Sequence, residues 1–465
     1  MFSTKPNQLR RLAAGIAPVA LILTCAGVGT VAAQEPPRSI PPGGPPPAGP
    51  NAIPIDGWLL YPSLDTFTQY SGNYFLTPLS KISGWSFGIS PKITAEWSNG
   101  IHSTTLFGTF TYIDYPTATK VNTNDGEATI TQQYAPLRDL NFTVLGDYTH
   151  NTIAPALTSA IPSPVSSSST SVLPNGDTVL PNGTIVNPNG QVVGQLGPSL
   201  NVGGLSVVNP YDAITASAKV QKIFGEGIVT LGSSLLRQNY EQQASQTRDF
   251  TAETFTEDAS FWTGPIFYVY SDAAFTINHN TAPVPDSSAY RAIGGLGTRQ
   301  IGLFRASAYF GHQGSQSVGF PAAGGNVYGG TLAYYPTPFW TVSANVDITI
   351  NLATSGAIPS TQALPLSSPL LIPLSNSTQI STSSIHSEYK ITPDWTANAL
   401  IGYSAAEFLN TANWENALFG ILRLQYNIRR DLTFGWEYDY TRITSNLPLT
   451  STARNFLAMS ASYKF

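Results

Sequence analysis

Histidine is the side chain in this sequence best suited to acid–base or metal chemistry near neutral pH. The chain has five histidines, and no two of them have the H-x-x-x-H spacing of helical zinc sites. His386 precedes Ser387, and His150 and His279 border long polar segments. A hydrolase using histidine with aspartate or serine therefore stays open as an alternative, although surface histidines are the ordinary case. We predict no catalytic residue, no metal and no cofactor from the five, which are His102, His150, His279, His312 and His386.

A second group of residues could act on ions rather than on covalent bonds. Eight ionisable side chains fall in the polar half of segments in which polar and apolar residues alternate. If these segments are strands of a closed sheet, the eight share its inner wall, where mixed charges can select solutes by charge. The alternatives are side chains merely solvated in a wide channel, or structural ion pairs. The predicted inner-wall residues are Lys219, Arg305, Asp347, Glu388, Lys390, Arg423, Glu437 and Asp439.

The elements that must position these residues are long β-strands. In residues 432–442, one face carries Leu, Phe, Trp and two Tyr, and the other carries Thr, Gly, Glu, Asp and Thr. Residues 340–351 and 418–428 alternate with the same period of two. A membrane-spanning strand needs about 9–11 residues, whereas strands of soluble proteins have about 5–6. The segment lengths therefore favour a transmembrane sheet over a soluble sandwich.

The connections between these segments alternate in length along the chain. Short turns such as those at 98–100, 224–226 and 429–430 are followed by longer polar stretches such as 312–326 and 352–379. An antiparallel up-and-down barrel has this pattern, with short periplasmic turns and long outer loops. We predict an all-β transmembrane barrel of about 16–18 strands, with 18 as the best count, in which the first strand at 64–76 is the least certain.

Composition agrees with a barrel and excludes other classes. Charged residues make up 11% of the chain, against about 25% in typical domains, and the mean hydropathy of −0.02 is too low for a helical membrane protein. Four aromatic residues near strand ends, Trp97, Trp340, Trp395 and Tyr403, are predicted to form belts at the membrane interface, with sugar stacking as the alternative. The net charge is −5 and no basic cluster occurs, which excludes nucleic acid as a partner.

The N-terminal region has the features of a secretory signal. Lys5, Arg10 and Arg11 precede an uncharged stretch that ends in small residues before Gln34, so we predict a cleaved signal peptide at 1–33. The alternative is a transmembrane anchor. Residues 34–58 are rich in proline and glycine and are predicted to be an extended periplasmic linker. The barrel is then expected at 59–465. The only cysteine, Cys25, lies within the signal, so the mature chain would have no disulfide.

The longest predicted loop, 151–208, has low sequence complexity. Its Pro-Asn-Gly triplet occurs three times at a spacing of seven residues, beginning at Pro174, Pro181 and Pro188. This triplet favours tight turns, because proline presets φ and Asn-Gly tolerates positive φ. We expect either a surface-exposed or lumen-folded element or a dispensable insertion.

The last eleven residues alternate up to the final phenylalanine. Tyr463 and Phe465 lie in the apolar half, whereas Lys464 lies in the polar half. This ending resembles the closing strand that bacterial outer-membrane barrels present to their assembly machinery. The stretches 82–115, 290–333 and 389–465 resemble the β-barrel porin 2 group of outer-membrane porins. The resemblance implies an outer-membrane location and a pore-like role. It offers no catalytic residues, and the Pro-Asn-Gly insertion departs from its pattern.

Together these features predict a porin-like channel for passive passage of small polar solutes or glycans. Its expected partners are outer-membrane lipid, the barrel-assembly machinery acting through Tyr463 and Phe465, and the polar solute or polysaccharide that passes. Two other functions remain open. One is an outer-membrane component of exopolysaccharide export, or a purely structural barrel, and the other is the hydrolase considered above.

Overall fold

The computed structural model describes most of the chain from residue 52 onward. The described residues are 52–73, 83–116, 122–154, 207–241, 249–281, 286–317, 322–352, 377–409, 412, 414–446 and 451–465, with four short strands between 171 and 195. The predicted signal peptide and most of the predicted linker lie outside these residues. Among the residues that the structure describes, no helix is long and apolar enough to span a membrane.

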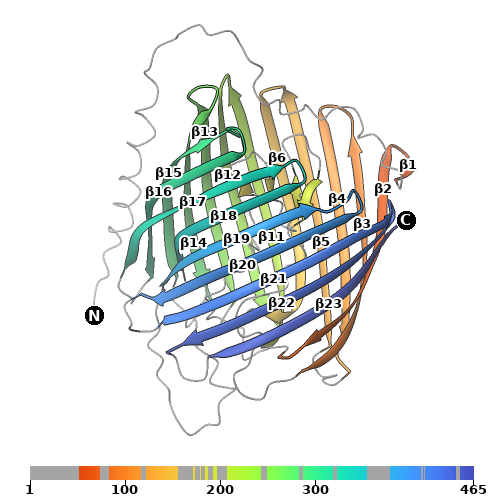
Figure 1. Ribbon diagram of the computed structural model, residues 1–465. Coiled ribbons are helices and arrows are strands. Elements are labelled where there is room, and N and C mark those ends of the chain that lie inside the picture. Colours follow the sequence, from red (N-terminus) through yellow and green to blue (C-terminus); the bar gives the residue numbers. More distant parts are fainter. Residues whose placement is uncertain are drawn as a thin grey trace. The chain divides into compact units, whose positions relative to one another are not determined.

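All regular structure in the described residues is β-strand (Figure 1). Most strands are 13–15 residues long, as the alternation over long segments predicts. The strands of the main sheet are β1 Ile53–Ile55, β2 Trp58–Ser71, β3 Gly84–Ser98, β4 His102–Asp114, β5 Thr123–Leu137, β6 Leu140–Ala154, β11 Val207–Phe224, β12 Gly227–Tyr240, β13 Phe250–Trp262, β14 Phe267–Asn280, β15 Ser287–Thr298, β16 Phe304–Ser317, β17 Ala323–Thr337, β18 Trp340–Leu352, β19 Ser377–Lys390, β20 Trp395–Phe408, β21 Trp414–Arg429, β22 Leu432–Ser445 and β23 Thr452–Lys464.

Eighteen of these strands close into an antiparallel barrel. Each strand pairs with the next along the chain, β6 pairs with β11, and β2 pairs with β23 to complete the ring. The seam runs from Ser63 opposite Lys464 to Ser71 opposite Phe456. Closure leaves no strand of the ring with an unpaired edge, which is the condition for a sheet to survive in hydrocarbon. The prediction of an all-β barrel with 18 strands is therefore confirmed.

The two ends of the barrel differ. At one end, which we call the turn end, consecutive strands are joined closely, as between Leu137 and Leu140 or between Phe224 and Gly227. The opposite end, which we call the loop end, carries the longer connections. The first ring strand, the least certain one in the sequence, is present and begins at Trp58 rather than at residue 64. It follows β1 through a two-residue turn in which Asp56 and Gly57 both have positive φ, as an Asp-Gly hairpin requires.

The two faces of the wall have opposite character. Large apolar side chains such as Phe310, Ile401 and Leu422 are 57–61% exposed and alternate with less exposed, mostly polar neighbours. A convex surface spreads its side chains apart and a concave one crowds them, so the exposed apolar set occupies the outside. We call it the outer face and the opposite one the inner face. This apolar-out, polar-in order is that of a membrane barrel.

The inner face also holds small apolar clusters. Ile380, Ala406, Ala417 and Ile443 are buried together near the loop end of β19–β22. Within the predicted loop 151–208, the strands β7 Ser171–Val172, β8 Thr178–Val179, β9 Thr184–Val186 and β10 Val192–Gln195 form a separate antiparallel sheet. In the sequence each Pro-Asn-Gly triplet falls between two of these strands, so the strands recur with the seven-residue repeat.

Candidate functional site: the ionisable inner wall

A row of ionisable residues crosses the inner face of β11 to β18. At its centre Asp258 on β13 stands directly opposite Asp272 on β14. The Nε atom of Arg291 on β15 lies 3.6 Å from Oδ1 of Asp272. Two carboxylates on adjacent positions repel each other, and the guanidinium offsets part of that repulsion. Both members of the ion pair are about one-third exposed, so the charges remain accessible from inside the barrel.

Tyr309 continues this row across two further strands. The guanidinium carbon of Arg291 is 5.8 Å from the centre of the Tyr309 ring, and the Tyr309 hydroxyl donates a hydrogen bond to Asp347. Gly329 lies between Tyr309 and Asp347 in the register of β16, β17 and β18. A Cβ at Gly329 would be 2.7 Å from the Tyr309 ring, so only glycine lets the ring lie flat and reach Asp347.

Lys219 adds a second positive charge to this row, and Arg305 is a predicted inner-wall residue that lies outside it. Lys219 is on β11, opposite Gly232 of β12, and a Cβ at Gly232 would be 3.3 Å from the Lys219 side chain. Arg305 is near the turn end of β16 and donates a hydrogen bond to the Tyr268 hydroxyl. The belt formed by Lys219, Asp258, Asp272, Arg291, Tyr309 and Asp347 therefore mixes both charge signs, and we call it the inner belt.

A second row joins four strands at one level. Glu388 of β19 is opposite Asn398 of β20, which is opposite Arg423 of β21, which is opposite Glu437 of β22. Arg423 forms an ion pair with Glu437. Lys390 is on the same face of β19, two residues nearer the turn end. Glu388, Arg423 and Glu437 are three of the predicted inner-wall residues, and the register brings them into one row.

Asp439 lies one step nearer the loop end and is only 1% exposed. The adjacent strand β23 carries Arg454, which is buried and two residues from Phe456, the register partner of Asp439. The Arg454 guanidinium carbon is 5.7 Å from the centre of the Phe456 ring. A buried carboxylate needs a nearby positive charge, so these residues have a structural role as much as a solute-facing one.

The inner face of β3 to β6 is mainly acidic. Asp147 on β6 accepts hydrogen bonds from Thr129 and Thr149 at 2.7 and 3.0 Å, and the same Thr129 hydroxyl oxygen lies 3.2 Å from Glu127 Oε1 on β5. Hydroxyl donors leave the carboxylate charge uncancelled. The nearby Lys92 is paired with Asp65 at 2.6 Å. This stretch of wall therefore presents a net negative surface, which we call the acidic patch, consisting of Glu127 and Asp147.

The sequence prediction missed much of this wall. It did not single out Asp258, Asp272, Arg291, Glu127 or Asp147, although alternation within their strands carried the signal. Phe255 is 52% exposed on the outer face of β13, which places Asp258, three residues later, on the inner face. What the sequence could not provide is the register that sets Asp258 opposite Asp272.

The histidines considered for hydrolysis do not form a serine–histidine pair in the described residues. His386 faces inward and accepts a hydrogen bond from, or donates one to, Asn398. Ser387 faces outward, where its hydroxyl accepts a hydrogen bond from Trp340 Nε1 at 3.0 Å. Consecutive residues of a strand point to opposite faces, so the two cannot act together.

The predicted assembly residues lie at the seam of the barrel. Tyr463 is opposite Leu64 on one side and Leu432 on the other, and its ring meets Phe465 edge-on at 4.8 Å. The backbone N–H of Phe465 donates to the Pro62 carbonyl at 3.0 Å. Trp340 and Tyr403, two of the predicted interface aromatics, are 40% and 45% exposed on the outer face.

No protein-family model matches this chain, and no curated protein matches it, so the resemblance to the β-barrel porin 2 group stays a prediction. Solved structures similar to this chain include OccK10 (OpdN) of Pseudomonas aeruginosa, with 10% identity over 87% of this chain and 99% of that one and a TM-score of 0.43. OpdO of the same organism has 12% identity over 87% and 97%, with a TM-score of 0.46. The ferric-catecholate import receptor Fiu from E. coli has 10% identity over 87% and 81%, with a TM-score of 0.40.

Proposed function

We propose that this chain is a passive channel in a bacterial outer membrane that admits small polar solutes and favours cations. The observation that carries the proposal is the division of one closed sheet into an apolar outer face and an ionisable inner face. Hydrocarbon can contact the outer face because every ring strand is hydrogen-bonded on both sides. The predicted signal peptide and closing strand support delivery to the outer membrane, with assembly through the sequence ending in Tyr463 and Phe465.

Barrel size supports passage rather than a filled interior. Barrels of about 8 strands are filled by their own side chains, whereas barrels of about 16–18 strands leave an aqueous channel unless loops fold into it. The inner wall here carries charges that are partly exposed, as at Asp272 and Arg291. Such groups require water beside them, because an unhydrated charge in a dry interior is costly.

The preference for cations rests on the acidic patch. In the inner belt the positive charges of Lys219 and Arg291 stand among acidic partners, and Arg423 is paired with Glu437. Glu127 and Asp147 have hydroxyl partners instead. An uncancelled negative wall raises the local concentration of cations and lowers that of anions.

The test is conductance of the full chain, folded in detergent and inserted into a planar bilayer. We expect stable conductance steps and, under a KCl gradient, a reversal potential of the sign for cation preference. Absence of steps from a correctly inserted barrel would contradict the channel and favour a structural or export-associated barrel. A reversal potential of the opposite sign would contradict the charge preference alone.

Glycans are a second candidate cargo within the same channel. The rings of Tyr270 and Tyr309 lie flat on the inner wall, over Gly295 and Gly329 respectively. Flat aromatic rings are suited to contact with the apolar faces of sugars, as well as with one another. If glycans pass, a linear oligosaccharide added to one side should interrupt the ion current, and Tyr309→Ala should shorten the interruptions.

A further inference from the structure

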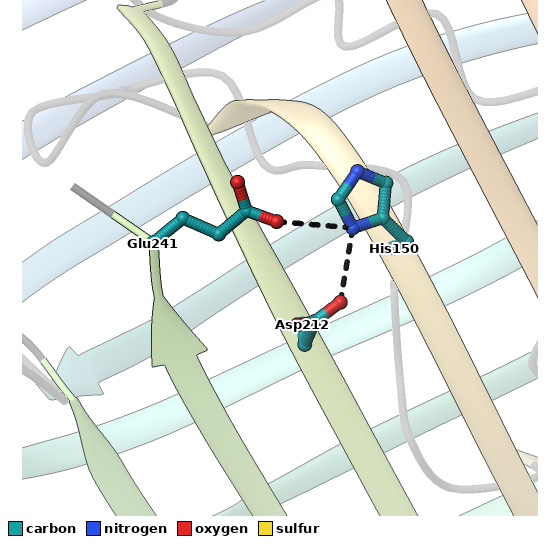
Figure 2. A group of neighbouring side chains, drawn as sticks. All are labelled: His150, Asp212 and Glu241. Carbon is teal, nitrogen blue, oxygen red and sulfur yellow. Dashed lines mark hydrogen bonds and ion pairs between the residues drawn. The ribbon is translucent and has the colours of Figure 1, made fainter.

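Three potential metal ligands meet on the outer face at the loop end of the barrel (Figure 2). They come from three neighbouring parts of the wall: His150 is on β6, Asp212 is on β11, and Glu241 directly follows the last residue of β12. Asp212 is the direct register partner of His150. The face is defined by Ile214 and Val144, which share the alternation of Asp212 and His150 and are 50% and 55% exposed. This cluster is separate from the inner wall that carries the proposed channel.

The spacing of the three atoms matches that of a small coordination sphere. His150 Nδ1 is 2.9 Å from Asp212 Oδ1 and 3.7 Å from Glu241 Oε1, and all three ligand atoms lie within 4.8 Å of one another. In a tetrahedral site with bonds of about 2.0–2.1 Å, ligand atoms are about 3.3 Å apart. Each distance to Nδ1 differs from this by about 0.4 Å. The third distance is between the Asp212 and Glu241 carboxylate oxygens. A small rotation of the half-exposed Glu241 side chain would bring it to a similar value.

The cluster is also held in place before any ligand binds. The Glu241 backbone N–H donates to the Pro210 carbonyl of β11 at 2.9 Å, which fixes the end of β12 beside Asp212. The Tyr148 hydroxyl donates to Asp212 Oδ1 at 2.8 Å. Hydrogen bonds from outside the ligand set orient the ligands and are worth about 10–100-fold in metal affinity.

Other histidines of the described strands lack this arrangement. His279 Nδ1 is 3.2 Å from Asp286 Oδ2 near the same end of the barrel, but no third ligand group joins this pair. His312 Nδ1 faces Asn326 Oδ1 at 3.4 Å. A histidine–aspartate pair alone is a common surface contact, and the added carboxylate of Glu241 is what distinguishes His150.

We propose that His150, Asp212 and Glu241 form a binding site for a divalent transition-metal cation such as Zn²⁺. Imidazole suits zinc, copper, iron and nickel, whereas calcium and magnesium prefer all-oxygen sites. Three protein ligands leave at least one coordination position open, and it faces outward, away from the channel. The site would therefore hold a cation at the surface of the barrel rather than select what passes through it.

The test is isothermal titration calorimetry of Zn²⁺ into the full chain, folded in detergent and carrying no histidine tag. We expect one saturable site per chain. His150→Ala and Glu241→Gln should each weaken it more than tenfold, and Tyr148→Phe about tenfold. The matched control His279→Ala removes a histidine–aspartate contact from the neighbouring region and should leave binding unchanged.

Three results would overturn the site. These are wild-type protein without saturable uptake, His150→Ala or Glu241→Gln protein that binds like wild type, and a His279→Ala variant that loses as much affinity as His150→Ala. Glu241 follows the end of β12 and is half exposed, so Glu241→Gln tests the site even if His150→Ala fails to fold. Displacement of zinc by an equal concentration of calcium would contradict ligation by imidazole. None of these outcomes depends on the conductance of the barrel.

Discussion

Removing both carboxylates of the acidic patch should reduce the cation preference of the channel by a calculable amount. The variant is Glu127→Gln with Asp147→Asn, which keeps the size of both side chains. In water, two unit charges about 10 Å from a passing ion contribute about 0.8 kcal/mol. Screening over one Debye length at 0.1 M salt reduces this to about 0.3 kcal/mol. Because the effect has opposite signs for cations and anions, the permeability ratio of K⁺ to Cl⁻ should fall about threefold.

The measurement is the reversal potential across a planar bilayer, with about 0.1 M KCl on one side and a tenfold lower concentration on the other. Wild type and the double variant should differ much less when the gradient runs from about 1 M KCl to a severalfold lower concentration, because the Debye length on the concentrated side is then about 3 Å. Dependence on salt distinguishes an electrostatic effect from a change in pore width, which would alter the conductance at every salt concentration.

A control that removes a single carboxylate is available on the outer face. Glu257 is exposed on β13, two residues from the outward-facing Phe255. Glu257→Gln removes a carboxylate from the wrong side of the wall and should leave the reversal potential unchanged. The reasoning fails if the double variant has the wild-type permeability ratio, or if the Glu257 control shifts it as much as the double variant does.

Three further predictions concern single residues of the barrel and its loop end. Leu422 is 57% exposed on the outer face, so Leu422→Arg should lower the free energy of unfolding in lipid vesicles by about 2–4 kcal/mol. Gln425→Arg on the inner face should change this free energy by less than about 0.5 kcal/mol. Equal urea midpoints for the two variants would contradict the assignment of faces. Gly329→Ala puts a Cβ 2.6 Å from the Val346 carbonyl oxygen and should cost about 1–3 kcal/mol, while Gly264→Ala, with nothing within 4 Å, should be neutral in the same assay. The Asn280 backbone N–H and the neighbouring His279 lower the pKa of Asp286, so their stabilising effect is present above the unfolded pKa of about 3.9 and is lost as the pH falls through the lower folded value. Protection of the Asn280 amide against hydrogen exchange should therefore decrease below about pH 4 in wild type, and a similar decrease in Asp286→Asn would show that another group controls it.

The fold was predictable because each strand carries its own evidence. Alternation in residues 340–351 and 432–442 states which side chains share a face, and this requires no knowledge of neighbouring strands. The weakest prediction was the first ring strand. β2 begins at Trp58 with Leu59 and Leu60 and contains Pro62, so its alternation is interrupted near the turn end. Pairing with β3 and β23 on its two sides supplies the information that its own sequence lacks.

The candidate sites were less predictable because they depend on contacts between strands. His150 and Asp212 are 62 positions apart, with the longest predicted loop between them. Neither residue has a neighbour in sequence that marks it as a ligand. The same holds for the row from Glu388 to Glu437, whose ionisable residues were predicted singly and whose alignment in one row comes from the register. Sequence alternation provides the face of a residue, and only pairing provides its partner.

The turns of the barrel show how that pairing is kept consistent with the two faces. At the β5–β6 turn, Leu137 is opposite Leu140, but beyond an irregularity Tyr134 is opposite Phe142. A regular ladder continued from Leu137 would instead place Tyr134 opposite Thr143, an outward residue opposite an inward one. A bulge inserts one unpaired residue and so shifts the register by one. Similar irregularities precede the β17–β18 and β21–β22 turns, between Tyr334 and Thr337 and between Asn427 and Arg429. Because a one-residue slip moves a whole strand to the other face, these bulges reconcile a tight turn with an apolar outside and a charged inside.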